Sequence, residues 1–124
     1  MPDEKPIHWI GSSHSDLVEF PERARKAAGY DLGRVQNSLM PLDWKPMESV
    51  GQGTQEIRIT TADGGASIQH RVPYVARFAE AVYVLHASEK TSQRTSRHDL
   101  EVGRARYKQM LQIRREAEKQ RNRE

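Results

Sequence analysis

Three β-type segments between residues 54 and 87 constrain the fold more than any other part of this 124-residue chain. The first, TQEIRIT, alternates apolar and polar residues, which is typical of a strand with one buried face. HRVPYVARF and AEAVYVLHA follow, and a tight connection near residues 78–80 predicts that these two strands pair as an antiparallel hairpin. The last strand is apolar at four consecutive positions, 82–85, as expected of a central strand covered on both faces.

Helical patterns flank this block on both sides. Ser12 or Ser13 can cap a short helix that Pro21 ends, and from residue 22 to about 39 apolar residues recur at helical spacing. Near the other end, Ser96 and Asp99 form a capping-box pattern that predicts a terminal helix with a narrow apolar stripe. The charged segment from about residue 114 has no apolar stripe, so we expect it to fray.

The order of these elements predicts an α+β fold. Residues 7–10 are interpreted as a short first strand, residues 40–53 as a loop, and residues 88–95 as a linker. We therefore expect one domain over residues 1–124, in which two N-terminal helices and a C-terminal helix pack on a four-stranded, mainly antiparallel sheet.

Composition excludes several classes of site and partner. The chain has no Cys, and its five His lie too far apart in sequence for a metal-ligand motif, so we expect neither a metal nor a cofactor. No segment approaches the roughly 20 apolar residues of a membrane span, and the N-terminus lacks a signal-peptide pattern. We expect a cytoplasmic protein without a membrane partner.

Charge is distributed unevenly along the chain. The net charge is only +3, but from residue 94 onward there are about two basic residues for each acidic one. A basic C-terminal third favours a polyanionic partner.

Three cationic side chains stand on or after neighbouring predicted strands, at Arg58, Arg71 and Lys90. If the strands pair, the three cations converge. RNA carries its own nucleophile, the 2′-hydroxyl, so a protein can cleave it by aligning that oxygen and neutralising charge on the phosphate. The pattern is therefore compatible with RNA cleavage.

Proton transfer would need further groups, for which His86, His70, Tyr74 and Lys90 are candidates. Other interpretations stay open. Arg58 and Arg71 can also be solvent-facing strand residues, His86 a structural histidine, Tyr74 a core aromatic, and Lys90 part of a solvated linker.

Several ordered blocks between Lys5 and about Leu111 resemble the phage-derived, HigB-like branch of the RelE/ParE toxin superfamily. The blocks are KPIHWIGSS, PERARKAAGYDLGRVQ, DWKPM, EIRI, RVPYVARFAEAVYVLHA and RTSRHDLEVGRARYK. The resemblance implies a RelE-like fold and the toxin component of a type II toxin–antitoxin system. It further implies a metal-independent, ribosome-dependent mRNA endonuclease whose partners are a helix-turn-helix antitoxin, the ribosome and mRNA.

By this resemblance, Arg71 contacts the scissile phosphate, Arg58 is a second cation on the preceding strand, and Lys90 is the cation after the last strand. His86 and Tyr74 are the candidates for proton transfer. The RNA-binding candidates are Lys45, Arg94, Arg97, Arg104 and Lys108. Replacing Arg71 with alanine is expected to abolish growth inhibition without unfolding the chain.

The chain departs from such relatives at three residues. Ser88 replaces an aromatic residue, Glu89 adds a negative charge beside Lys90, and Pro73 removes a backbone donor from a strand, which predicts a bulge or an edge position. The alternative is therefore a non-enzymatic or decayed toxin of the same fold, which binds a gyrase-type protein target or only its antitoxin.

Overall fold

Six strands and three helices make up residues 4–90 and 96–123, which the computed structural model describes. The strands are β1 (Ile7–Trp9), β2 (Trp44–Pro46), β3 (Thr54–Asp63), β4 (Ala66–Val75), β5 (Val82–Val84) and β6 (Ser88–Lys90). The helices are α1 (Ser13–Val18), α2 (Glu22–Gln36) and α3 (Arg97–Arg123). The fold class is thus α+β.

The sheet is mixed and has six strands, so the prediction of a four-stranded, mainly antiparallel sheet is wrong in this respect. Its strand order is β1-β5-β4-β3-β2, and β6 pairs with β4. β1 and β5 run parallel, and the other pairs are antiparallel. β2 and β6 lie in segments interpreted as loop and linker, because three residues without an apolar period leave no strand signal.

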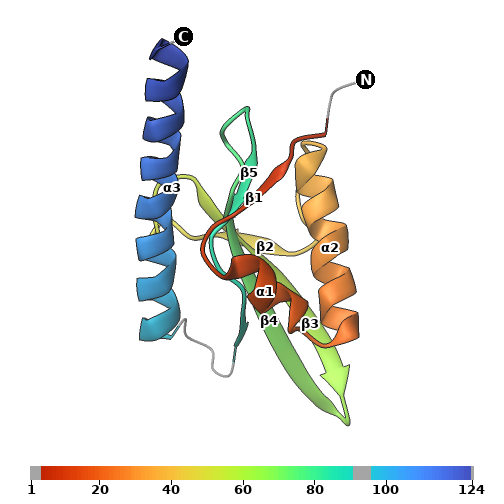
Figure 1. Ribbon diagram of the computed structural model, residues 1–124. Coiled ribbons are helices and arrows are strands. Elements are labelled where there is room, and N and C mark those ends of the chain that lie inside the picture. The colour runs from red at the N-terminus through yellow and green to blue at the C-terminus, as the bar shows by residue number, and fades with distance from the viewer. Residues whose placement is uncertain (1–3, 91–95, 124) are drawn as a thin grey trace.

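The β3–β4 hairpin is the longest paired unit of the sheet, with ten residues in each strand. The two strands meet at Gly64 and Gly65, whose φ angles of 59° and 87° lie in the left-handed region that two-residue hairpin turns require. The predicted turn thus occupies only two residues, and the strands extend further than the sequence indicated. In Figure 1 the tip of this hairpin projects beyond the ends of the three helices.

A bulge separates β5 from β6 along the same edge of β4. Tyr74 pairs with Val84, whereas Arg71 pairs with Ser88, so the register shifts by one residue between the two short strands. Pro73 lies at this interruption, and its carbonyl accepts a hydrogen bond from the Leu85 N–H at 2.9 Å. The bulge expected from Pro73 is confirmed, because its missing N–H falls where the ladder is broken.

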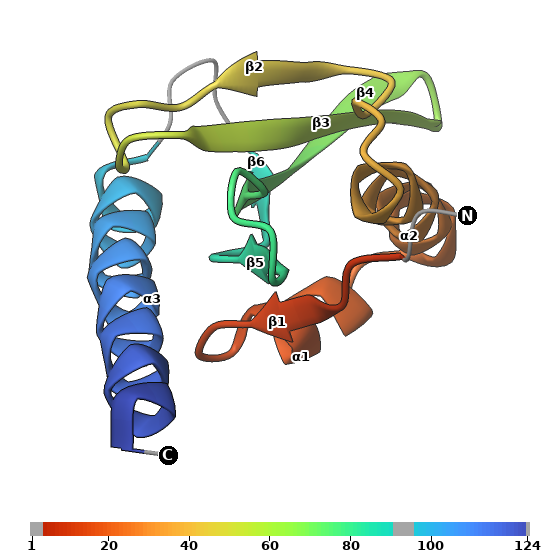
Figure 2. The same cartoon turned by 90° about the horizontal axis from the view of Figure 1, so that it is seen from above.

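Helices cover the two faces of the sheet separately, with α2 on one side and α3 on the other in both views (Figures 1 and 2). On the α2 side, β3, β4 and β5 bury Ile57, Ile59, Val72, Tyr74, Val82 and Val84 against α1 and α2. On the α3 side, Val75, Tyr83 and Leu85 pack with Met110 and with the loop residues Met47 and Val50. β4 and β5 therefore contribute side chains to both cores, whereas β3 contributes only to the core on the α2 side.

Helix boundaries differ from the sequence expectation at two points. α2 ends at Gln36 rather than about residue 39, because Ser38 has a φ of 64° and its neighbour Leu39 donates its N–H to the Arg34 carbonyl. α3 continues to Arg123, so the tail expected to fray from about residue 114 is helical. Side-chain pairs one turn apart, such as Gln112 with Glu116, support this exposed part.

The ion pair between Glu80 and Arg114 fastens α3 to the segment before β5. Arg114 Nε donates to Glu80 Oε2 at 2.6 Å, and the Tyr83 hydroxyl donates to the same oxygen at 2.7 Å. The hydrogen bond from Arg114 lowers the pKa of Glu80 from 4.5 to about 2. Glu80 thus stabilises the fold above pH 4.5, and this contribution is lost as the pH falls toward 2.

Replacing Glu80 with glutamine is expected to lower the free energy of unfolding by about 1 kcal/mol at pH 7, because the pair is partly exposed and screened by water. The difference between variant and wild type should shrink as the pH approaches 2. Urea unfolding at pH 7, 4 and 2.5 measures this difference, and Glu118→Gln, which removes an exposed carboxylate of α3, is the control. A difference that is constant with pH would contradict the assignment.

Candidate functional site

Arg58, Arg71 and Lys90 lie on three paired strands and face the same side of the sheet. Arg58 is the register partner of Arg71 across β3 and β4, and Lys90 is the register partner of Gln69 across β6 and β4. Gln69 and Arg71 are two residues apart on β4, so their side chains share a face. The convergence expected from the sequence is therefore present on the α3 side of the sheet.

Lys45 on β2 adds a fourth cation to this face, because it pairs in register with Glu56 of β3. Its Nζ lies 3.9 Å from Glu56 Oε1, and the same oxygen accepts a 2.7 Å hydrogen bond from Arg71 Nη1. We call Lys45, Arg58, Arg71 and Lys90 the cation cluster. A buried carboxylate thus lies among its members.

Glu56 is the residue that sequence reasoning did not include in the site. Alternation in TQEIRIT placed Glu56 on the same face as Arg58, which was the available signal. Glu56 is only 2% exposed, and Arg71 beside it is 5% exposed. Arg71 also donates from Nη2 to Gln69 Oε1 at 3.0 Å, so two acceptors hold its guanidinium.

Two guanidinium N–H groups in the cluster have no acceptor within residues 4–90 and 96–123. They are on the Nε atoms of Arg58 and Arg71, which are both buried. A buried cationic donor without a partner is costly, and an anionic oxygen is the acceptor that best offsets this cost. The cluster therefore has unused capacity for an anion such as a phosphate.

Lys90 is electrostatically coupled to the other members of the cluster. Burial lowers the pKa of its ammonium, and the charges of Arg71, Lys45 and Arg58 lower it further, while Glu56 opposes them. The ammonium thus loses its proton more readily than that of an ordinary lysine. A lysine of this kind can stabilise negative charge and can also exchange a proton.

His86 is bound to α3. Its Nε2 lies 2.8 Å from Asp99 Oδ1, and the residue is 8% exposed. Burial raises the pKa of Asp99, but the hydrogen bonds to His86 and Ser96 outweigh burial and leave that pKa below its usual value. The predicted capping role of Ser96 is confirmed, because its hydroxyl accepts the Asp99 N–H at 3.0 Å. His86 thereby connects the end of β5 to the first turn of α3.

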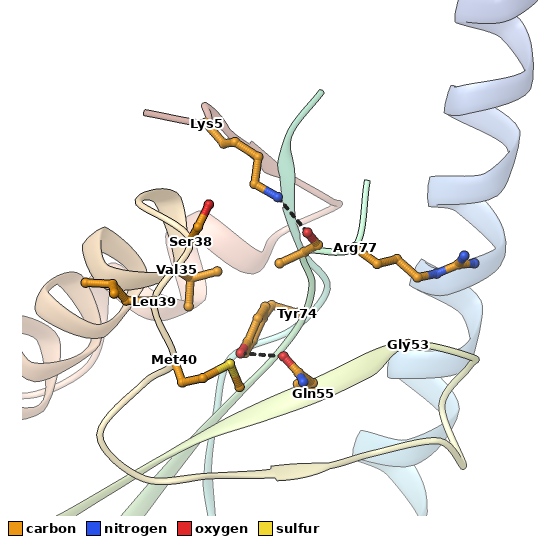
Figure 3. Close-up of a pocket in the computed structure, with 10 residues that line it drawn as sticks. Lys5, Val35, Ser38, Leu39, Met40, Gly53, Gln55, Tyr74 and Arg77 are labelled. Carbon is orange, nitrogen blue, oxygen red and sulfur yellow. Dashed lines mark hydrogen bonds between the residues drawn. The ribbon is translucent and has the colours of Figure 1, made fainter. Parts of the chain in front are cut away.

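Tyr74 lies on the opposite side of the sheet from the cation cluster, in the core beneath α2. Its hydroxyl donates to Gln55 Oε1 at 2.8 Å, and burial followed by the charge of Asp31 raises its pKa. Figure 3 shows it in a pocket of about 340 Å³ with Val35, Met40 and Gln55. Lys5 lies above them, and its ammonium donates to the Ala76 carbonyl at 2.6 Å.

A comparison with known protein families shows to which family this chain belongs. A family model described as phage derived protein Gp49-like matches residues 15–108. The chain belongs to this family. The match to the Gp49-like family includes the whole cation cluster and Glu56, and it ends before the last part of α3. No curated protein matches the chain.

The RNA-binding candidates of this Gp49-like chain fall in two places. Lys45 belongs to the cation cluster, whereas Arg97, Arg104 and Lys108 are exposed on α3 at spacings that place them along one stripe. Arg97 pairs with Glu101 at 3.2 Å, and Arg104 donates to the Ser49 carbonyl at 2.8 Å. Arg94 lies outside the described residues.

A second groove, of about 390 Å³, lies between α1 and β6, and His86 lines it. His70 and His98 also line this groove, with Asp16, Glu19 and Glu89.

Within residues 4–90 and 96–123, no group of three or more His, Cys, Asp or Glu side chains could hold a metal ion. Over the same residues, no helix has the length and apolar character needed to cross a membrane.

Proposed function

We propose that this Gp49-like chain is the toxin of a type II toxin–antitoxin pair and that it cleaves mRNA on the ribosome. The observation that carries the proposal is the cation cluster, in which two buried guanidinium N–H groups lack an acceptor in the described part of the chain. The resemblance of the chain to HigB-like toxins supports the same reading. The proposed partners are the ribosome, mRNA and a helix-turn-helix antitoxin.

In the proposed reaction the cluster holds the scissile phosphate. The 2′-hydroxyl oxygen attacks phosphorus, the bond to the 5′-oxygen breaks, and negative charge grows on the phosphate oxygens. Arg58 and Arg71 are the donors for these oxygens, and Lys90 adds a third positive charge close to them. Such charge neutralisation requires no metal.

Lys90 is also the proposed proton carrier: its neutral amine takes the proton of the 2′-hydroxyl, and the ammonium so formed gives that proton to the leaving 5′-oxygen. Its lowered pKa and its place in the cluster favour it over His86, whose Nε2 is engaged by Asp99, and over Tyr74, which lies in the opposite core. The exposed stripe Arg97, Arg104 and Lys108 on α3 supplies proposed contacts to the backbone of ribosomal RNA.

A protein-binding toxin of the same fold is the second candidate. It is favoured by the Glu56 carboxylate, which already neutralises part of the charge on Arg71 and Lys45. In that case the chain inhibits growth by occupying a protein target, without cutting RNA.

Phosphate binding by the cluster is tested with a labelled single-stranded oligodeoxynucleotide, which lacks the 2′-hydroxyl and cannot be cleaved. Arg58→Gln is expected to weaken binding at low salt and to reduce the slope of log K against log salt concentration by about 0.7–1, which corresponds to one phosphate contact. Arg25→Gln, which removes an exposed arginine of α2 on the other side of the sheet, is the matched control. Equal salt slopes for Arg58→Gln and Arg25→Gln would show that the cation cluster does not bind the phosphate.

A further inference from the structure

Glu56 is a buried carboxylate at the centre of a site proposed to bind another anion. Its register partners are Lys45 on β2 and Pro73 on β4, so it faces the cation cluster from the middle of the sheet. With 2% of its surface exposed it cannot be a solvated surface charge. Arg71 and Lys45 both approach its Oε1 atom, at 2.7 Å and 3.9 Å.

The first consequence concerns the orientation of Arg71. Glu56 accepts from Nη1 and Gln69 accepts from Nη2, so both ends of the planar guanidinium are held by residues of β3 and β4. A guanidinium held at both ends has a fixed plane, so its other N–H groups point in fixed directions. One of these N–H groups is on Nε, which has no hydrogen-bond acceptor among the described residues.

The second consequence concerns charge. Four cations on one sheet face repel one another, and Glu56 is the carboxylate that touches two of them. The same negative charge repels a phosphate bound by these cations. Glu56 therefore keeps the cluster assembled and at the same time weakens its attraction for RNA.

We infer that Glu56 is a positioning residue, which fixes the guanidinium of Arg71 for the phosphate of bound RNA and limits how tightly that RNA is held. This inference rests on the proposed function. The inference predicts opposite changes in RNA affinity and in the rate of cleavage. Loss of the carboxylate charge should strengthen RNA binding, and it should also loosen the alignment of Arg71 that cleavage needs.

Glu56→Gln is the direct test, since it keeps the shape and an acceptor oxygen but removes the charge. We expect the variant to bind the uncleavable oligodeoxynucleotide about threefold to tenfold more tightly at low salt. On programmed ribosomes we expect kcat for mRNA cleavage to fall about tenfold or more, with a lower KM. A role in stability alone would change neither quantity for the folded protein, whose fraction is measured by circular dichroism.

Two further variants make the result unambiguous. Glu22→Gln changes the net charge by the same amount at an exposed site on α2, so it should leave affinity and cleavage unchanged. Glu56→Asp keeps the charge but shortens the reach to Arg71, so it should bind the oligodeoxynucleotide like the wild type and still lose kcat. Glu56→Gln binding no tighter than Glu22→Gln, or full kcat in Glu56→Asp, would overturn the inference.

Failure of the proposed function gives a different pattern. A wild-type chain that never cleaves mRNA, with tighter oligonucleotide binding by Glu56→Gln, refutes the endonuclease and supports the control of affinity by Glu56. Cleavage by the wild type that is unaltered in Glu56→Gln supports the endonuclease and refutes the role of Glu56.

Discussion

Arg71→Ala is expected to lower the free energy of unfolding by about 3–5 kcal/mol, because it leaves the buried carboxylate of Glu56 without its main partner. The sequence alone suggested that this substitution would remove activity and leave the fold intact. The ion pair changes that expectation, since Arg71 and Glu56 are both almost fully buried. Urea unfolding of the wild type and the variant measures the loss.

A double variant separates the ion pair from the rest of the side chain. If the uncompensated charge is the main cause, Glu56→Gln combined with Arg71→Met should be more stable than Arg71→Met alone. Arg58→Ala is the comparison on the neighbouring strand, because Arg58 is only half-buried and has no carboxylate partner within hydrogen-bond distance among the described residues. Equal losses for Arg58→Ala and Arg71→Ala would contradict the assigned role of the buried pair.

Lys90→Met is expected to lower the rate of mRNA cleavage by about 10²–10³-fold, in the range found when one donor to a developing oxyanion is removed. The substitution removes a positive charge and the proposed proton carrier at the same position. Lys90 is only partly buried and ends the three-residue strand β6, so we expect the variant to stay folded. Cleavage of a translated message on purified ribosomes measures the rate.

Lys26→Met is the matched control for Lys90→Met. Lys26 is an exposed lysine on α2 that pairs with Glu22, on the other side of the sheet from the cation cluster. The Lys26→Met variant should cleave mRNA at the wild-type rate. A Lys90→Met variant as active as Lys26→Met would assign the chemistry to other residues.

The long elements of the fold could be predicted because their side-chain patterns are long enough to show a period. TQEIRIT indicated β3, and the apolar spacing after Pro21 indicated α2. β2 and β6 could not be predicted, because each has three residues and gains its order from β3 or β4 beside it. The parallel pairing of β1 with β5 is likewise set by tertiary packing.

The candidate site was predictable in its cations but not in its carboxylate. Strand position placed Arg58, Arg71 and Lys90 together, since pairing of neighbouring strands brings register partners within reach. The burial of Glu56 depends on the pairing of β3 with β2 and β4, which brings Lys45 and Arg71 beside it and which no local pattern records. Tyr74 was placed correctly on a strand, whereas His86, expected at a strand end, lies between β5 and β6. Their partners Gln55 and Asp99 come from elements that only the fold brings close.

The central claim is that the cation cluster cleaves mRNA, and mapping of mRNA 5′ ends after induction in a bacterial host tests it most directly. Induction of the wild-type chain should stop growth and create new 5′ ends within the coding regions of translated messages. Lys90→Met, expressed at the same level, should create none. Growth arrest without new 5′ ends, or identical ends from Lys90→Met, would contradict the account.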